Sequence, residues 1–176
     1  MLWMFLVSNI IGCSYTRHIK RLEAPEKDHW AALRVFMQED QKKDYLTRKT
    51  RPERDEYLKS LGLWDKFYNL DEKRREDILA YNVQEGWNQE ELLMSWGIPF
   101  KKQMEAGSKH GVSAERWVYR FEEHSDKKTG ERYILIWEEN SKTEYKSDRV
   151  FEREVVIDDH GRPEWTDNII SQIIDK

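Results

Sequence analysis

Apolar residues recur at helical spacing through the first half of the chain. The first stripe predicts a helix from Pro25 to about Lys43, because its apolar positions fall on one face. These positions are Trp30, Leu33, Phe36 and Met37. Pro25 suits the first turn of a helix, where the missing backbone N–H does no harm. The chain therefore starts its folded part with a helix that has one buried face.

Two more helices are predicted between residues 50 and 81. Thr50 and Glu53 have the spacing of a capping box, and Gly62 marks the end of the helix they open. Asp71 has the position of an N-cap for a third helix, roughly from Glu72 to Tyr81. An aromatic segment between them, residues 63–68, is expected to form a short helical turn.

The stretch from Asn82 to Pro99 predicts a turn, a two-turn helix and a sharp end. Asn88 and Glu91 form a second capping-box pair. The expected apolar face, which we predict to cover a sheet, consists of Leu92, Leu93 and Trp96. Gly97 then supplies the left-handed residue that ends a helix, and Pro99 prevents its continuation. A helix this short needs tertiary packing to be stable in water.

After a polar segment at residues 101–112, which we expect to be a loop, the hydrophobic period changes to two. Alternating positions predict strands at about residues 116–121, 132–137 and 149–157. In the tail, residues 166–174, apolar positions return to helical spacing and predict a last helix. Those positions are Ile169, Ile170, Ile173 and Ile174.

These patterns together predict an α+β fold. N-terminal helices are followed by a short helix that packs on the predicted strands and by a C-terminal helix. The predicted organisation is a signal peptide (1–12), a tether (13–24), a helical segment (25–81) and an α+β domain (82–176). The helical segment is also compatible with a separate interaction domain.

Composition places the chain among folded, highly charged proteins. Charged residues make up 36% of its 176 residues and hydrophobic residues 38%, and its eight Trp argue against disorder. The net charge is −4, with both signs mixed along the chain. Because no basic stripe stands out, we expect no nucleic-acid partner.

The first thirteen residues differ from the rest. Residues 1–11 are almost entirely apolar but too short to span a bilayer, which takes about 20 residues. They lead into Ile10-Ile11-Gly12-Cys13, and Cys13 is the only cysteine. This resembles a bacterial lipoprotein signal, although no Lys or Arg precedes the apolar run. The resemblance implies a lipid on Cys13 (diacylglyceryl on its sulfur, with palmitate-type acyl chains) and cleavage before it. The alternative is a buried N-terminal strand with a buried free cysteine.

Residues after Cys13 are polar and basic. Ser14 follows the cysteine, and in such lipoproteins this implies the outer membrane rather than retention in the inner membrane. Arg17, His18, Lys20 and Arg21 would stand next to the membrane, where they favour an anionic lipid surface. The alternative is an ordinary solvated linker.

Candidate catalytic and metal-binding groups do not converge in the sequence. No two of the five histidines stand at i and i+4, and we expect no catalytic residues, no metal and no cofactor. Glu122-Glu123-His124 and Asp158-Asp159-His160 each combine acids with an imidazole, and a metal site there is the alternative to solvated turns. Neighbouring residues of a strand point to opposite faces, which works against shared ligation.

Aromatic residues on the predicted strands form the candidate binding surface. Trp117, Tyr119 and Trp137 could line a surface for a partner or ligand, since Trp and Tyr are enriched at interfaces. The alternative is that these rings belong to the core or form cross-strand pairs.

The region from about residue 82 to 157 resembles a known family. A Gly-containing turn, Gly86-Trp87-Asn88, precedes the short helix; Trp96-Gly97-Ile98-Pro99 ends it; and a strand begins Arg116-Trp117-Val118-Tyr119. This resembles the outer-membrane lipoproteins of the SmpA/OmlA type, which include a small lipoprotein of the β-barrel assembly machinery and have relatives with β-lactamase-inhibitor-like folds. Their motif has Met and Thr where this chain has Trp87 and Asn88. The preceding helical segment also resembles GWxTD-type bacterial proteins.

The resemblance implies that the predicted strands form a three-stranded antiparallel sheet. It also implies a lipid-anchored protein on the periplasmic side of the outer membrane. It implies a non-catalytic scaffold that binds other envelope proteins, with a role in outer-membrane assembly. The alternative function is a periplasmic ligand-binding domain or enzyme that uses an aromatic-lined sheet face.

Overall fold

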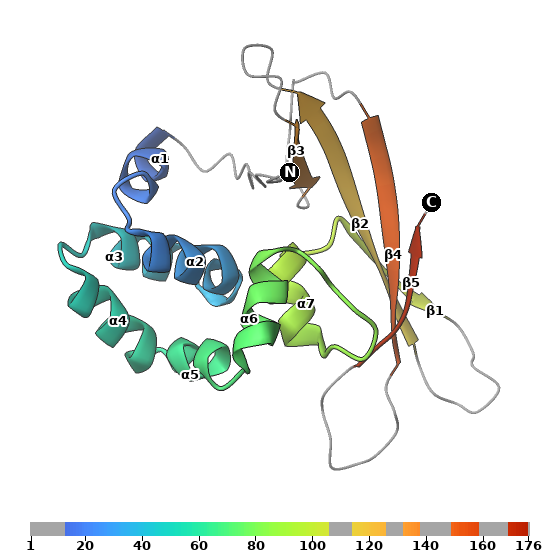
Figure 1. Cartoon of the computed structure of the whole chain (residues 1–176), viewed down its shortest axis with the longest axis horizontal. Helices are drawn as coiled ribbons and strands as arrows, with labels where there is room; N and C mark the ends of the chain where they lie inside the picture. Colours follow the sequence, from blue (N-terminus) through green and yellow to red (C-terminus); the bar gives the residue numbers. More distant parts are fainter. Residues whose placement is uncertain (1–12, 106–113, 126–131, 138–148, 159–168, 176) are drawn as a thin grey trace. The chain divides into compact units, whose positions relative to one another are not determined.

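The computed structural model describes residues 13–105, 114–125, 132–137, 149–158 and 169–175. The chain divides into two compact units, one helical and one built around a sheet (Figure 1). The helical unit contains Ile11–Val83 and Leu93–Ser95, and the sheet unit contains Gln84–Leu92 and the chain from Trp96 onward. The predicted signal peptide, residues 1–12, lies outside the described residues.

Short helices build the helical unit. They are α1 (Cys13–Ile19), α2 (Ala24–Leu33), the 3₁₀ helix η1 (Arg34–Phe36), α3 (Glu39–Thr47), α4 (Arg51–Ser60), α5 (Leu63–Tyr68) and α6 (Glu72–Leu79). The single helix predicted from Pro25 to Lys43 is therefore wrong. It breaks because Met37 and Gln38 are extended, and Gln38 opens α3 in a capping box with Gln41.

The other predicted boundaries in this unit are confirmed. Thr50 accepts the backbone N–H of Glu53 at the start of α4, and Gly62 ends this helix region with φ +69°. Asp71 caps α6 by accepting the backbone N–H of Arg74 at 2.8 Å. Local capping chemistry alone therefore places these ends correctly.

The core of the helical unit is formed by the apolar faces of α2 to α6. Leu33, Tyr45 and Leu58 are fully buried. The other buried apolar side chains of this unit, among the described residues, are Leu22, Trp30, Ala32, Met37, Leu46, Leu63, Phe67, Ile78 and Met94 of the chain segment Leu93–Ser95.

Helix α7 (Gln89–Trp96) has the predicted ends. Asn88 and Glu91 exchange capping bonds of 2.8 and 2.9 Å, and Gly97 has φ +76°. Trp96 packs edge-on against rings of the sheet, as predicted. Leu93 differs from the prediction, because it is only half-buried and belongs to the helical unit.

Every described strand pair is antiparallel. The strands are β1 (Lys101–Glu105), β2 (Ala114–Ser125), β3 (Arg132–Trp137), β4 (Arg149–Asp158) and β5 (Ile169–Asp175). Strand β2 is central: β1 and β3 pair with successive parts of one of its edges, and β4 pairs with the other. Strand β5 pairs with β4.

The predicted α+β class is confirmed, and the three expected strands are β2, β3 and β4. Strand β1 occupies part of the predicted polar loop, where exposed lysines suit the edge of a sheet.

The predicted C-terminal helix is wrong, because these residues form β5. The register shifts by one residue between Val156 and Ile157, so Ile170 and Ile173 stand opposite Ile157 and Val155. Because of this bulge, Ile170 and Ile173 lie on the same face of the strand although they are three residues apart. A spacing of three residues is also typical of one face of a helix.

One face of the sheet carries the core of its unit. Trp117, Tyr119 and Phe121 alternate along β2 and stand opposite Val155, Arg153 and Phe151 of β4. Trp117, Tyr119 and Val155 are fully buried, and Trp96 contacts the rings of Tyr119 and Phe121.

Candidate functional site

Trp117 and Tyr119 lie inside the folded sheet unit, with no exposed surface. The interpretation of these two rings as an exposed partner surface therefore has to be corrected, because their face of β2 is covered. Trp137 belongs to β3, where its register partner is Arg120. That position alternates with those of Trp117 and Tyr119, so the three residues do not share a face.

The polar groups of Trp117 and Tyr119 make contacts that stabilise the fold. The Tyr119 hydroxyl donates to the carbonyl of Gly97 at 3.1 Å, and burial raises the pKa of Tyr119 well above its usual value. The Trp117 indole N–H donates to Glu115 at 2.8 Å, and the Lys102 ammonium lies 3.9 Å from the centre of its ring. Both polar groups are thus satisfied within the sheet unit.

Cys13 is the first residue that the structure describes, and it begins α1. Lipidation of Cys13 stays a prediction, since the preceding lipobox residues lie outside the described part of the chain.

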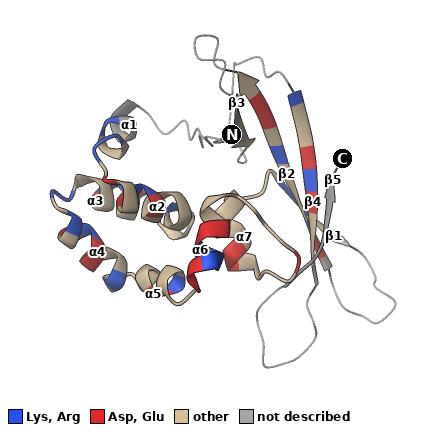
Figure 2. Cartoon of the chain, viewed as in Figure 1, with Lys and Arg blue, Asp and Glu red and all other residues tan. Residues whose placement is uncertain are grey.

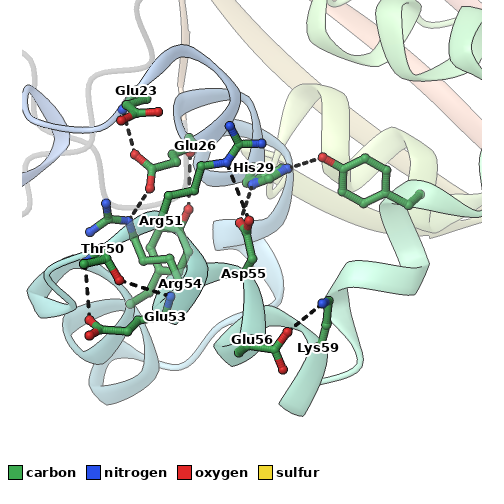
Figure 3. A network of polar contacts seen from close by, with 12 residues as sticks. Glu23, Glu26, His29, Thr50, Arg51, Glu53, Arg54, Asp55, Glu56 and Lys59 are labelled. Atoms are coloured by element: carbon green, nitrogen blue, oxygen red, sulfur yellow. Dashed lines mark hydrogen bonds and ion pairs between the residues drawn. The ribbon is translucent and has the colours of Figure 1, made fainter.

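A polar network, which sequence reasoning missed, runs from the interior of the helical unit to its surface at Tyr68, which is 37% exposed (Figure 3). We call it the buried network and define it by Glu26 and His29 of α2, Arg54 and Asp55 of α4, and Tyr68 of α5. Glu26 and His29 have only 0% and 1% of their surface exposed. A signal was present, because Glu26 and His29 share helical spacing with Trp30 and Leu33, but the sequence does not reveal their partners.

One half of the buried network is an ion pair. The Arg54 Nε lies 2.6 Å from a carboxylate oxygen of Glu26, and the other oxygen accepts the backbone N–H of Glu23 at 2.7 Å. A second guanidinium nitrogen of Arg54 donates to the carbonyl of Arg48. Both charges are therefore hydrogen-bonded as well as paired, which burial requires.

The other half runs from Tyr68 through His29 to Asp55. The Tyr68 hydroxyl and His29 Nε2 are 2.5 Å apart, whereas His29 Nδ1 and the nearest Asp55 oxygen are 3.8 Å apart. The Arg51 Nε lies 3.6 Å from the other carboxylate oxygen of Asp55. The His29 ring is enclosed by the rings of Trp64, Phe67 and Tyr68, whose centres are 5.3–6.0 Å away.

The order Tyr, His and Asp is that of a nucleophile, its base and an orienting acid. The electrostatics work against such activation. Burial lowers the pKa of His29, with Asp55 acting in the opposite direction, and burial followed by the charge of Asp55 raises the pKa of Tyr68. The proton is thus held on Tyr68, and the geometry is that of a neutral hydrogen bond that ties α2 to α5.

A surface pocket of about 220 Å³ lies beside this hydrogen bond. It is lined by Pro25, Asp28, His29, Phe67, Tyr68, Glu72, Arg75, Glu76 and Leu79. Pockets for drug-sized ligands run from about 300 to 1,000 Å³, so this one has room for a side chain or a small molecule. Burial raises the pKa of Asp28 in this lining.

Polar side chains also pair along and across strand β2 of the sheet unit. His124 Nε2 lies 3.2 Å from a Glu122 oxygen, and an Arg116 nitrogen lies 2.6 Å from Glu154. The acid–histidine run was expected at a turn, but it lies within β2, where positions i and i+2 share a face. Within the described residues, no group of three or more His, Cys, Asp or Glu side chains could hold a metal. His160 and Asp159 lie outside those residues.

Comparisons with protein families, with curated proteins and with solved structures found no match to this chain. The resemblance to SmpA/OmlA-type lipoproteins therefore stays a prediction. Among the described helices, none has the length and apolar character needed to cross a membrane.

Proposed function

We propose that this chain is a bacterial lipoprotein, anchored through Cys13 on the periplasmic side of the outer membrane. In this proposal its folded units act as a non-catalytic module that binds other envelope proteins. The observation that carries it is the apolar run ending in Ile10-Ile11-Gly12-Cys13, with no other cysteine in the chain.

The fold supports the family part of the proposal. The resemblance implies a short helix that ends at a Gly and packs on one face of an antiparallel sheet. Helix α7 ends before Gly97, and Trp96 lies against two rings of β2.

The buried network supports a binding role over a catalytic one. Both members of its charged pair are buried and hydrogen-bonded, and the pKa shifts of His29 and Tyr68 oppose formation of a phenolate. Such a network stiffens a helical scaffold without offering an activated group to a substrate.

The anchor is tested by metabolic labelling with a radioactive fatty acid in a bacterial host. We expect label on the unaltered protein and on a Ser14→Ala control, and none on Cys13→Ser. Equal labelling of Cys13→Ser and the unaltered protein would refute lipidation at this residue.

The binding role is tested by photo-crosslinking in cells, with the crosslinker placed at exposed positions of the sheet unit. Met104 and Ile98 are 66% and 44% exposed, and the buried Trp117 serves as the negative control. Discrete adducts with envelope proteins from the exposed positions are expected. Protein that stays uncrosslinked at both positions in intact cells contradicts the proposal.

A small-ligand role is the second candidate, and the pocket beside Tyr68 favours it. The aromatic sheet face first considered for this role is covered by the core, whereas the helical pocket is open and combines a hydroxyl with carboxylates. A fragment screen by NMR checks this role, with Tyr68→Phe as the matched variant. If no fragment binds, or if fragments bind Tyr68→Phe as tightly as the unaltered protein, the pocket does not have this role.

A further inference from the structure

Helix α1 carries positive charge on an exposed surface. Arg17, Lys20 and Arg21 are exposed, and residues 13–22 contain no Asp or Glu. Figure 2 accordingly shows basic residues and no acidic ones along α1, which contains Arg17, and the turn after it, which contains Lys20 and Arg21. Most other helices of the helical unit carry both signs, although a second basic run, Arg48, Lys49 and Arg51, lies between α3 and the start of α4 (Figure 2). The segment at residues 13–22 differs from that run in its position next to Cys13.

The attachment of α1 leaves these charges in solvent. The Tyr15 hydroxyl donates to the carbonyl of Glu39 at 3.4 Å, at the start of α3. Leu22, just after the basic residues, is buried with 4% exposure. Contacts at residues 15 and 22 therefore hold the segment to the helical unit, while its three strong bases remain outside.

The distance from Cys13 is short. Because a helix rises about 1.5 Å per residue, Arg17 lies roughly 6 Å along the axis of α1 from Cys13. Lys20 and Arg21 follow in the turn directly after the end of α1 at Ile19. Charge interactions in physiological salt extend over about 8 Å. If Cys13 is held at a bilayer surface, the basic side chains of residues 17–21 lie within or close to the distance over which they attract the phospholipid headgroups.

We propose that α1 and the turn after it, residues 13–21, bind the anionic headgroups of phospholipids. This inference rests on the proposed function, since it takes Cys13 as the membrane anchor. The occupant follows from charge complementarity and from the position of the patch beside the anchored residue. The bound headgroups orient the helical unit at the membrane, a task that a single flexible acyl attachment does not perform.

The test uses the full chain with Cys13→Ser, so that acylation plays no part. Its binding to vesicles of phosphatidylcholine is compared with binding to vesicles that also contain phosphatidylglycerol. The ratio of the two affinities cancels the contribution of the apolar N-terminal residues. Each basic residue near an anionic surface contributes roughly fivefold, so three predict a ratio on the order of 100, falling as salt rises.

The decisive variant combines Arg17→Gln, Lys20→Gln and Arg21→Gln. Its matched control, Lys49→Gln with Lys59→Gln and Lys73→Gln, removes the same charge from exposed positions on other parts of the helical unit. We expect the first variant to lose most of the anionic preference and the control to keep it. Circular dichroism verifies folding, and Arg17→Gln alone, with a roughly fivefold loss, serves if the triple variant unfolds.

Three results would overturn the inference: no anionic preference in the starting protein, equal losses in both triple variants, or binding to polyglutamate in place of vesicles. Equal losses would mean that the total number of basic residues, and not their position in residues 13–21, sets the preference for anionic vesicles. Polyglutamate binding would indicate an acidic protein partner. Fatty-acid labelling of the unaltered protein is read separately, so failure of the lipid patch is distinguishable from failure of the anchor.

Discussion

Replacing Arg54 by Met should remove the cation that pairs with a fully buried carboxylate. Glu26 has no exposed surface, and the side chain of Arg54 is 10% exposed. The two groups are 2.6 Å apart across α2 and α4. Met fills much of the space of the arginine stem, so the change mainly deletes the guanidinium and its hydrogen bonds.

We expect Arg54→Met to lower the free energy of unfolding by about 3–5 kcal/mol, the usual cost of leaving one charge of a buried pair uncompensated. Glu26→Gln with Arg54→Met should recover most of this loss, because a neutral amide oxygen can still accept the Glu23 backbone N–H. The two single variants and the double variant form a cycle that isolates the coupling between the groups.

The assay is urea unfolding followed by circular dichroism at 222 nm, a wavelength at which helices dominate the signal. The matched control is Lys59→Met on the same helix. The Lys59–Glu56 pair has the same 2.6 Å separation, but its side chains are 47% and 72% exposed, so we expect little measurable change. If Arg54→Met is as mild as this control, water reaches the Glu26 pair and the reasoning from burial is wrong.

Three further predictions concern single residues. Burial lowers the pKa of His29 below its ordinary 6.5, so on acidification His29 takes up its proton in the unfolded chain before it does so in the folded chain. The free energy of unfolding should therefore fall as the pH drops below about 6.5. A plot of this free energy against pH should have a flatter slope for His29→Gln than for a His18→Gln control. Tyr119→Phe leaves the Gly97 carbonyl without its donor and should cost about 1–2 kcal/mol; an unchanged urea midpoint would contradict this. Gly97→Val should cost about 1 kcal/mol or more, because φ is +76° there; equal thermal stability would show that the helix end tolerates a side chain.

Capping residues allowed much of the fold to be predicted from the sequence. Thr50, Asp71 and Asn88 each stand at the predicted start of a helix, and Gly97 ends α7 as expected. These signals work because the donor and acceptor are three residues apart, so the bond needs no information about the rest of the fold.

Signals that depend on a distant partner were misread. The isoleucines of the tail have helical spacing, but a bulge opposite β4 produces the same spacing in a strand. Trp117 and Trp137 each belong to a run in which apolar residues recur at every second position. The register of β2 and β3, however, pairs Trp137 with Arg120, which is three residues from Trp117 and so belongs to the other set of alternating positions in β2. Pairing register is a property of two strands together, so neither strand specifies it alone.

The buried network shows the same division between local and distant information. The sequence by itself determined only that Glu26 and His29 have helical spacing with Trp30 and Leu33, because 3.6-residue periodicity is local. Only the tertiary structure decided their partners, Arg54 at 28 residues and Tyr68 at 39 residues along the chain. A buried charge or imidazole must be satisfied by whatever group the packing brings to it, and that group is selected by the fold rather than by sequence spacing.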